Sequence, residues 1–118
     1  MWNLEYIERE VKRLKEMPTA WVCNNDKTAH FLIAALNKKG IKVPDDVSIT
    51  GFDDLPNEYP AIPDTLTTAR VFGDEIGKAA FEHLLWRISN PDAGPRRIMI
   101  GVQFINGMTS AAPNANNG

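Results

Sequence analysis

Two apolar runs of strand length, separated by one helix-length segment, constrain the fold of this chain more than any other feature. The runs are "TAWVC" at 19–23 and "VSITGF" at 47–52. The segment between them has apolar residues at the three- and four-residue spacing of an amphipathic helix: Ala29, Leu32, Ile33 and Leu36. A strand, a helix and a second strand in this order predict two parallel strands joined by a right-handed crossover.

The rest of the chain continues the alternation of helices and strands. Apolar spacing predicts a helix over 3–16, which Pro18 ends, and a third helix over about 74–88. Residues 53–66 contain prolines and are expected to be irregular, and 97–105 is predicted to be a third strand. Four apolar residues of the third helix are expected to face inward: Ile76, Ala80, Leu84 and Ile88. The order predicts an α/β fold, a parallel sheet with flanking helices.

Polar side chains follow both of the first two predicted strands. Asn24, Asn25 and Asp26 come after the first strand, and Asp53 and Asp54 come after the second. If the two strands are parallel neighbours, these five side chains gather at one edge of the sheet. Open α/β sheets bind ligands outside the carboxyl ends of their strands. The sequence therefore predicts a binding site rich in hydrogen-bond acceptors at this edge.

Each side chain of this edge has a structural and a functional interpretation. Asp26 starts a helix and is expected to cap it or to serve another structural role. For Asn25 two roles stay open, a helix cap and a contact with a hydroxylated ligand. Asp53 is expected to bind ligand, because a carboxylate can accept from two sugar hydroxyls at once. Asp54 is expected to shape the turn through its own backbone.

Several classes of function are disfavoured by the sequence. His30 and His83 have no third ligand at metal spacing, so no metal site is expected. The single cysteine, Cys23, ends an apolar run and is expected to be buried, which fits a reducing compartment. The formal net charge of −2 argues against nucleic-acid binding by this chain alone, and no apolar run reaches membrane-spanning length. Neither glycine-rich nucleotide motif occurs, and no cofactor is expected.

Several motifs, in order, go beyond a general α/β pattern. They are "PTAWVCNND", "GIKVPDDVSITGFDD" and "LTT", followed by a helix containing Gly77 and Ala80. From about Pro18 to Ser110 the chain resembles the carboxyl-terminal part of the LacI/GalR family of transcriptional regulators. The resemblance implies an effector domain with a periplasmic-binding-protein-like type I fold of two α/β subdomains. A small molecule, often a sugar or a nucleobase-related metabolite, binds between the subdomains, and its binding is communicated to a helix-turn-helix on operator DNA.

The resemblance also implies roles for particular residues. Asp53 matches the ligand-binding aspartate of the family's "GFDD" motif, and Asn25 matches a position that contacts ligand in sugar-responsive members. Phe72 lies in the segment 70–73, which often supplies an aromatic or polar ligand contact. The family's regulators are cytoplasmic and are not enzymes.

The domain boundaries follow from the same resemblance. Residues 1–68 are expected to form part of the carboxyl-terminal subdomain, and 69–91 to belong to the amino-terminal subdomain of a longer protein. Residues 92–110 are expected to return to the carboxyl-terminal subdomain, and 111–118 to form a loose tail. The chain is thus expected to be a fragment without the helix-turn-helix. The third helix then lacks its packing surface, and a homodimer is predicted.

Two other functions share part of this pattern. A solute-binding protein of a sugar transporter has the same fold, but it would carry an export signal instead of a helix-turn-helix. A magnesium-dependent phosphoacceptor domain would need its acid pair after the first strand and a lysine after a later one. Here the acid pair follows the second strand, so this function is ranked last.

Overall fold

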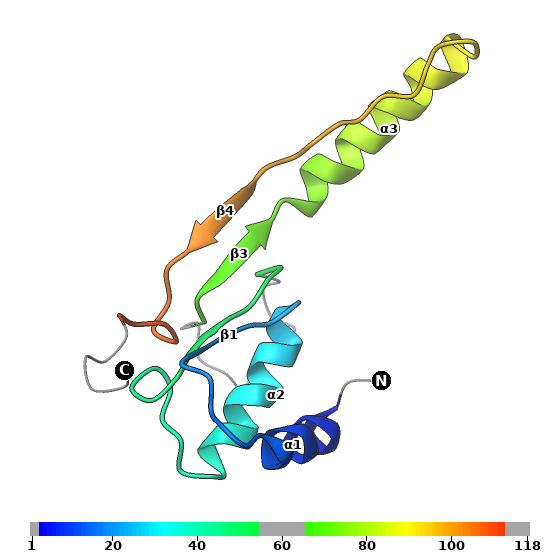
Figure 1. Ribbon diagram of the computed structural model, residues 1–118. Helices are drawn as coiled ribbons and strands as arrows, with labels where there is room; N and C mark the ends of the chain where they lie inside the picture. The colour runs from blue at the N-terminus through cyan, green and yellow to red at the C-terminus, as the bar shows by residue number, and fades with distance from the viewer. Residues whose placement is uncertain (1–2, 55–65, 113–118) are drawn as a thin grey trace.

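The computed structural model of the protein describes residues 3–54 and 66–112. Three helices and four strands occur in these residues: α1 (Leu4–Arg13), β1 (Ala20–Val22), α2 (Asp26–Asn37), β2 (Ser48–Thr50), β3 (Thr68–Val71), α3 (Gly73–Ser89) and β4 (Val102–Ile105). Figure 1 shows a compact body formed by α1, α2, β1 and β2, from which β3, α3 and β4 extend. The predicted α/β class is confirmed. Nearly all of the segment predicted to be irregular, and residues 113–118 of the expected tail, lie outside the described residues.

The strand–helix–strand unit forms as predicted. β1 and β2 pair in parallel, with Trp21 opposite Ile49, and α2 makes the crossover between them. The turn after α2 reverses at Gly40, whose φ of 74° suits a residue without a Cβ. One face of the two strands is covered by α1 and α2, and the opposite face is open, as the 87% exposure of Val22 shows.

The core lies between this face and the two helices. It consists of ten buried residues: Ile7, Val11, Cys23, Ala29, Leu32, Ala35, Leu36, Val47, Ile49 and Leu66. The helical spacing of the apolar residues in α1 and α2 explains this arrangement, because every third or fourth side chain turns toward the strands. The body is therefore held by a hydrophobic core whose residues run from Ile7 to Leu66.

The third predicted strand differs from the expectation. Only Val102–Ile105 form a strand, and it pairs antiparallel with β3, which the sequence did not predict. β3 has only four residues, and its alternation of polar and apolar side chains is too short to predict a strand. Its extended form is stabilised by two neighbours. β4 is one neighbour, and the other is the end of β2, reached through parallel bridges between Thr50 and Thr67 and between Asp53 and Arg70. We call the pair of β3 and β4 the ribbon.

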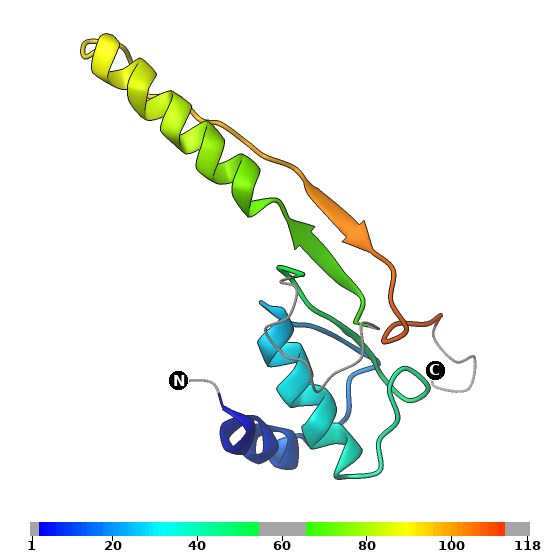
Figure 2. The ribbon, with the colours of Figure 1, turned by 180° about the vertical axis from the view of Figure 1, so that it is seen from behind.

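The ribbon carries α3 away from the body, as both views in Figures 1 and 2 show. The radius of gyration is 18.8 Å, whereas a compact chain of this length would have roughly 13–14 Å. No residue of α3 is buried, and Ile76, Leu84 and Ile88 are 45%, 55% and 68% exposed. The expectation that these residues and Ala80 face inward is wrong for this structure, because the segment at 96–100 approaches α3 only along one side and leaves Ile76, Ala80, Leu84 and Ile88 exposed.

The uncovered apolar surface is large. Besides Ile76, Leu84 and Ile88 it includes seven further side chains on α3 and on the return segment: Phe81, Leu85, Ile98, Met99, Val102, Phe104 and Met108. Nine of these ten side chains are at least half exposed, and exposed apolar surface on this scale is typical of interaction sites. A surface of this size favours association.

In the described part of the chain, no helix is long and apolar enough to cross a membrane.

The exposed side of α3 gives a first prediction. Replacing Leu84 with Glu should weaken self-association of the chain, because a charge replaces an apolar side chain that a partner would bury. We expect the dissociation constant to rise roughly 10- to 100-fold, measured by sedimentation equilibrium over a concentration series. Ser89→Glu is the matched control, since it adds the same charge to the opposite side of α3 and should leave the constant unchanged. A wild-type mass equal to that of one chain at every concentration would contradict the prediction.

Candidate functional site

The parallel pairing of β1 and β2 brings their carboxyl ends together. Beyond the two strands, the Cys23 amide donates to the Thr50 carbonyl at 2.8 Å, and the Asp26 amide donates to the Phe52 carbonyl at 2.9 Å. The "NND" and "FDD" segments therefore run side by side, as the sequence predicts. We call the residues at 24–26 and 52–54 the polar edge.

Asn25 is the residue that caps α2. Its side-chain oxygen accepts from the Thr28 amide at 2.8 Å, and its backbone is extended, as a helix cap requires. This settles which residue caps the helix. The Asn25 side chain is half-buried and still offers an amide group to the polar edge, so its contact with a ligand stays a prediction.

Asp26 does not cap the helix and instead connects three segments of the chain. It is the first residue of α2, and its two carboxylate oxygens accept from different partners. Oδ2 accepts from the Asp54 amide at 2.8 Å, and Oδ1 accepts from the Thr68 hydroxyl at 2.6 Å.

The two acids of "FDD" form a turn with unusual backbone angles. Asp53 has φ of 111° and Asp54 has φ of 50°. Positive φ at a residue with a Cβ costs about 1–3 kcal/mol and persists where surrounding contacts hold it. Here the ribbon supplies two such contacts: the Asp53 amide donates to the Ala69 carbonyl at 2.9 Å, and the Val71 amide donates to the Asp53 carbonyl at 3.0 Å. We call Asp53 and Asp54 the acidic turn.

Asp54 also contacts the ribbon through its side chain. The Arg70 guanidinium Nε donates to Asp54 Oδ2 at 2.6 Å, with the two side chains 46% and 27% exposed. A pair this exposed adds little to stability, but it fixes the direction of the Asp54 carboxylate. Asp53, whose side chain is half-buried, is the other carboxylate of the turn. Its assignment as the ligand contact stays a prediction.

Phe72 follows the ribbon directly. It precedes α3 and is half-buried, one residue beyond Val71, whose amide is bonded to Asp53. Because Val71 is bonded to Asp53, the next residue, Phe72, lies near the acidic turn. Its contact with a ligand stays a prediction. In contrast, no sequence pattern indicated Thr68 or Arg70 as partners of the polar edge, because they lie 42 and 16 residues from the carboxylates that they contact.

Two titratable groups beside the polar edge are affected by burial. Burial raises the pKa of the Cys23 thiol to about 11, so this thiol is protonated at neutral pH and is a poor nucleophile. Burial also lowers the pKa of His30, while the nearby Asp26 carboxylate partly opposes that change. Within residues 3–54 and 66–112, no group of three or more His, Cys, Asp and Glu side chains could hold a metal ion.

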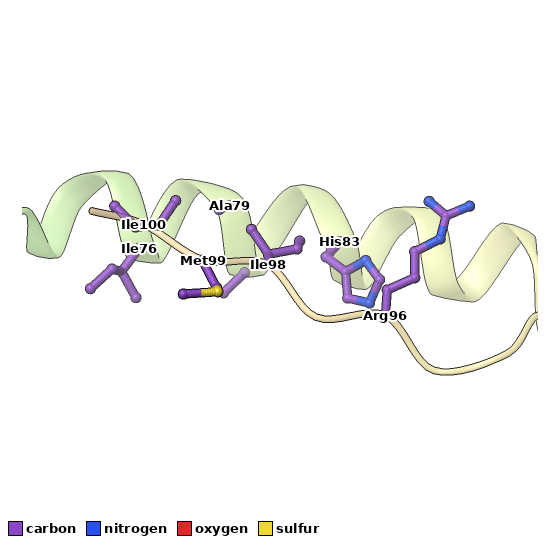
Figure 3. Close-up of a pocket in the computed structure, with 8 residues that line it drawn as sticks. Ile76, Ala79, His83, Arg96, Ile98, Met99 and Ile100 are labelled. Atoms are coloured by element: carbon purple, nitrogen blue, oxygen red, sulfur yellow. The ribbon is translucent and has the colours of Figure 1, made fainter.

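A separate pocket of about 480 Å³ lies on α3, away from the polar edge. Figure 3 shows its lining between the helix and the extended segment that returns toward β4: Ile76, Ala79, Ala80, His83, Arg96, Ile98, Met99 and Ile100. Arg96 lies over the ring of Trp86, and His83 stacks on the same ring, which orders the far end of this pair of segments. The pocket is open and largely apolar, and it contains none of the predicted site residues.

Gly51 gives a prediction about the polar edge. A Cβ at this position would lie 2.2 Å from Asp26 Oδ1 and 2.9 Å from Leu66 Cδ2. Gly51→Ala should therefore destabilise the fold by about 1–3 kcal/mol or more, since Asp26 cannot move without losing its bonds. Urea unfolding measures the change.

Gly77→Ala is the matched control for that experiment, because nothing lies within 4 Å of a Cβ in the middle of α3. This control should be neutral or should stabilise by about 0.5–1 kcal/mol. Equal free energies of unfolding for Gly51→Ala and the wild type would contradict the packing of Asp26 described above.

His30 gives a prediction about the charge of Asp26. Asp26→Asn should lower the pKa of His30 further, because the opposing carboxylate is lost while burial remains. As pH falls through 6.5, the unfolded chain then takes up the proton first, so acid should destabilise the variant more than the wild type. Titration of the imidazole by NMR measures the pKa. Asp74→Asn on α3 is the control and should leave it unchanged, and an unchanged or raised pKa in Asp26→Asn would refute the prediction.

The chain matches one family model, described as a periplasmic binding protein-like domain, over residues 1–110. The HTH-type transcriptional repressor PurR of Vibrio parahaemolyticus is 42% identical over 87 residues, which are 73% of this chain and 25% of that protein. The arabinose metabolism transcriptional repressor of Geobacillus stearothermophilus is 42% identical over 86 residues, 72% of this chain and 23% of that protein. The chain therefore spans about a quarter of the length of these relatives.

Solved structures are similar as well. A LacI family transcriptional regulator from Enterococcus faecium with bound ribose has a TM-score of 0.72 and 27% identity, covering 92% of this chain and 39% of that one. The Lac repressor dimer bound to operator and an anti-inducer has a TM-score of 0.77 and 25% identity, covering 92% and 37%. The resemblance drawn from the sequence motifs is thereby confirmed, and the chain belongs to the periplasmic binding protein-like domain family, as part of an effector domain of the LacI/GalR type.

Proposed function

We propose that this chain forms part of the small-molecule sensor of a DNA-binding transcriptional regulator, with Asp53 as a ligand contact. The observation that carries the proposal is the acidic turn, whose two residues are held at positive φ at the carboxyl end of β2. Backbone strain of this kind persists where function requires a fixed geometry. The edge of an open α/β sheet is also where ligands of such folds bind.

A sugar is the first candidate ligand. A carboxylate can accept from two neighbouring hydroxyls, and the Asn25 amide can both donate and accept, which suits a neutral polyol. One similar structure holds ribose, and one relative is named as an arabinose metabolism repressor. Other relatives carry the name PurR, so a nucleobase-related metabolite is the competing ligand class.

The proposal assigns the parts of the chain to two subdomains. Residues 1–68 contribute to the carboxyl-terminal subdomain, and 69–91 belong to the amino-terminal subdomain. Residues 92–110 lead back to the carboxyl-terminal subdomain. This assignment is supported by the ribbon, which leads to an α3 without buried residues. The ligand would then lie between the polar edge and a wall supplied by the amino-terminal subdomain, with Phe72 at the crossing point.

The mechanism is a shift between two arrangements of the subdomains. A ligand that binds one arrangement more tightly increases its population, and that arrangement changes affinity for operator DNA. DNA would be held by a helix-turn-helix outside this chain, in a cytoplasmic homodimer. The relatives named above are repressors, and the similar Lac repressor structure is a dimer on operator, which favours a regulator over an enzyme.

A solute-binding protein of a sugar transporter is the alternative with the same fold. The gene sequence upstream of the codon for Met1 distinguishes the two. A helix-turn-helix and a further α/β subdomain in frame would support the regulator, whereas an export signal would support the transporter component. The names of the relatives favour the regulator.

Asp53→Ala in the full-length protein tests the ligand contact. Loss of charge-assisted hydrogen bonds should weaken effector binding roughly 10- to 100-fold, while affinity for operator DNA without effector is kept. Thermal-shift screening of pentoses, hexoses and purine bases identifies the effector, and calorimetry measures its affinity. Asp74→Ala on α3 is the matched control. Normal release from operator by the Asp53→Ala protein at wild-type effector concentration would refute the assignment.

A further inference from the structure

We propose that Asp26 is a positioning residue that holds the acidic turn and, through Thr68, links this turn to the ribbon. The inference rests on the proposed function in one respect, since it takes Asp53 of the turn as the ligand contact. It goes beyond that function by naming the side chains that make the polar edge depend on the orientation of the ribbon.

The contacts of Asp26 show why a carboxylate is suited to this position. Its two oxygens accept from donors on separate segments, the Asp54 amide in the turn and the Thr68 hydroxyl in the ribbon. An ionised carboxylate provides acceptors in both directions, whereas Ser, Thr and hydrocarbon side chains do not. Gly51 leaves the space that Oδ1 occupies. The backbone amide of Asp26 adds a third link, to Phe52.

Thr68 anchors the ribbon to this carboxylate. It is the first residue of β3, it pairs with Ile105 of β4, and it is 3% exposed. A hydroxyl buried to this degree needs a partner, and a charged acceptor at 2.6 Å is a strong one. The root of the ribbon is thus fixed to the first residue of α2 by a side-chain bond.

The acidic turn lies between these two anchors. On one side Asp26 accepts from the Asp54 amide, and on the other Asp53 exchanges backbone bonds with Ala69 and Val71 of the ribbon. A change in the orientation of the ribbon must therefore either break the bond between Thr68 and Asp26 or move the acidic turn. Asp26 and Thr68 make the position of Asp53 depend on the ribbon.

Hydrogen exchange on the 118-residue chain tests this link without any ligand. Thr68→Val keeps the shape of the side chain and removes the hydroxyl. We expect the amides of Asp53 and Val71 to exchange about tenfold faster. The amides of Cys23 and Ser48, which bond within the β1–β2 pair, should change by less than about threefold. An equal increase at all four amides would mean a general loss of stability and would overturn the proposal.

Two substitutions serve as controls for that experiment. Thr50→Val makes the same chemical change in β2, where this hydroxyl has no hydrogen bond to any part of the chain that the structure describes. It should leave unchanged the ratio of exchange at Asp53 and Val71 to exchange at Cys23 and Ser48. Thr68→Ser keeps the hydroxyl and should restore the wild-type ratio. A Thr68→Ser protein that behaves as Thr68→Val does would overturn the proposal, because the hydroxyl would then not be the cause.

Further measurements decide the matter even if Thr68→Val does not fold. In the wild type, the Thr68 hydroxyl proton should give an NMR signal that exchanges slowly with water, and its absence would overturn the proposal. Asp26→Ala removes both acceptors, so the amides of Asp53 and Asp54 should exchange about tenfold faster than in the wild type, and unchanged protection of these two amides would likewise overturn the proposal. Failure of every sugar and purine base to bind would instead refute the proposed function.

Discussion

The parallel pairing of β1 with β2 is the constraint on which the rest of the structure depends. It buries Ile49 against α1 and α2, and it places the segments after both strands side by side. Because parallel strands end at the same edge, polar residues that are 28 positions apart meet there and form the bond between Asp26 and Asp54. Without this pairing neither the core nor the polar edge would exist.

The body and the extension that it carries are stabilised in different ways. The body has a buried core, whereas the 17 residues of α3 bury none of their side chains. An isolated helix of this length is marginal in water, since nucleation is costly and each residue adds little. Local contacts such as the stacking of Arg96 and His83 on Trp86 help, but the stability of α3 depends on a surface that covers its apolar side. Its sequence, apolar on one broad side, is typical of a helix whose apolar side is covered.

The sequence predicted the elements whose signals are local. Helical spacing identified α1, α2 and α3, and the runs of β-branched and aromatic residues identified β1 and β2. It missed β3, because Thr68–Val71 are extended through backbone bonds to β4 and to the acidic turn, which no local pattern reveals. The inward side of α3 was predicted correctly as an apolar surface and wrongly as a buried one, since periodicity tells which side is apolar and not what covers it.

The polar edge was predictable in its location and less so in its connections. Strand order alone brought Asn25, Asp26, Asp53 and Asp54 together, but the division of labour between Asn25 as the cap and Asp26 as the link needed the structure. The motif alone also did not explain why residue 51 is a glycine. The structure shows that the Asp26 carboxylate occupies the space that a Cβ would take.

The geometry of the acidic turn bears on the sensing proposed for this chain. The positive φ angles of Asp53 and Asp54 cost free energy that the bonds to α2 and to the ribbon offset. A ligand held by Asp53 would bind best when the ribbon keeps these bonds, and less well in any arrangement that breaks them. It would shift the population toward the first arrangement by no more than its difference in affinity for the two. In the proposed sensor, the two side-chain bonds of the ribbon, from Thr68 to Asp26 and from Arg70 to Asp54, would connect ligand occupancy with the placement of α3.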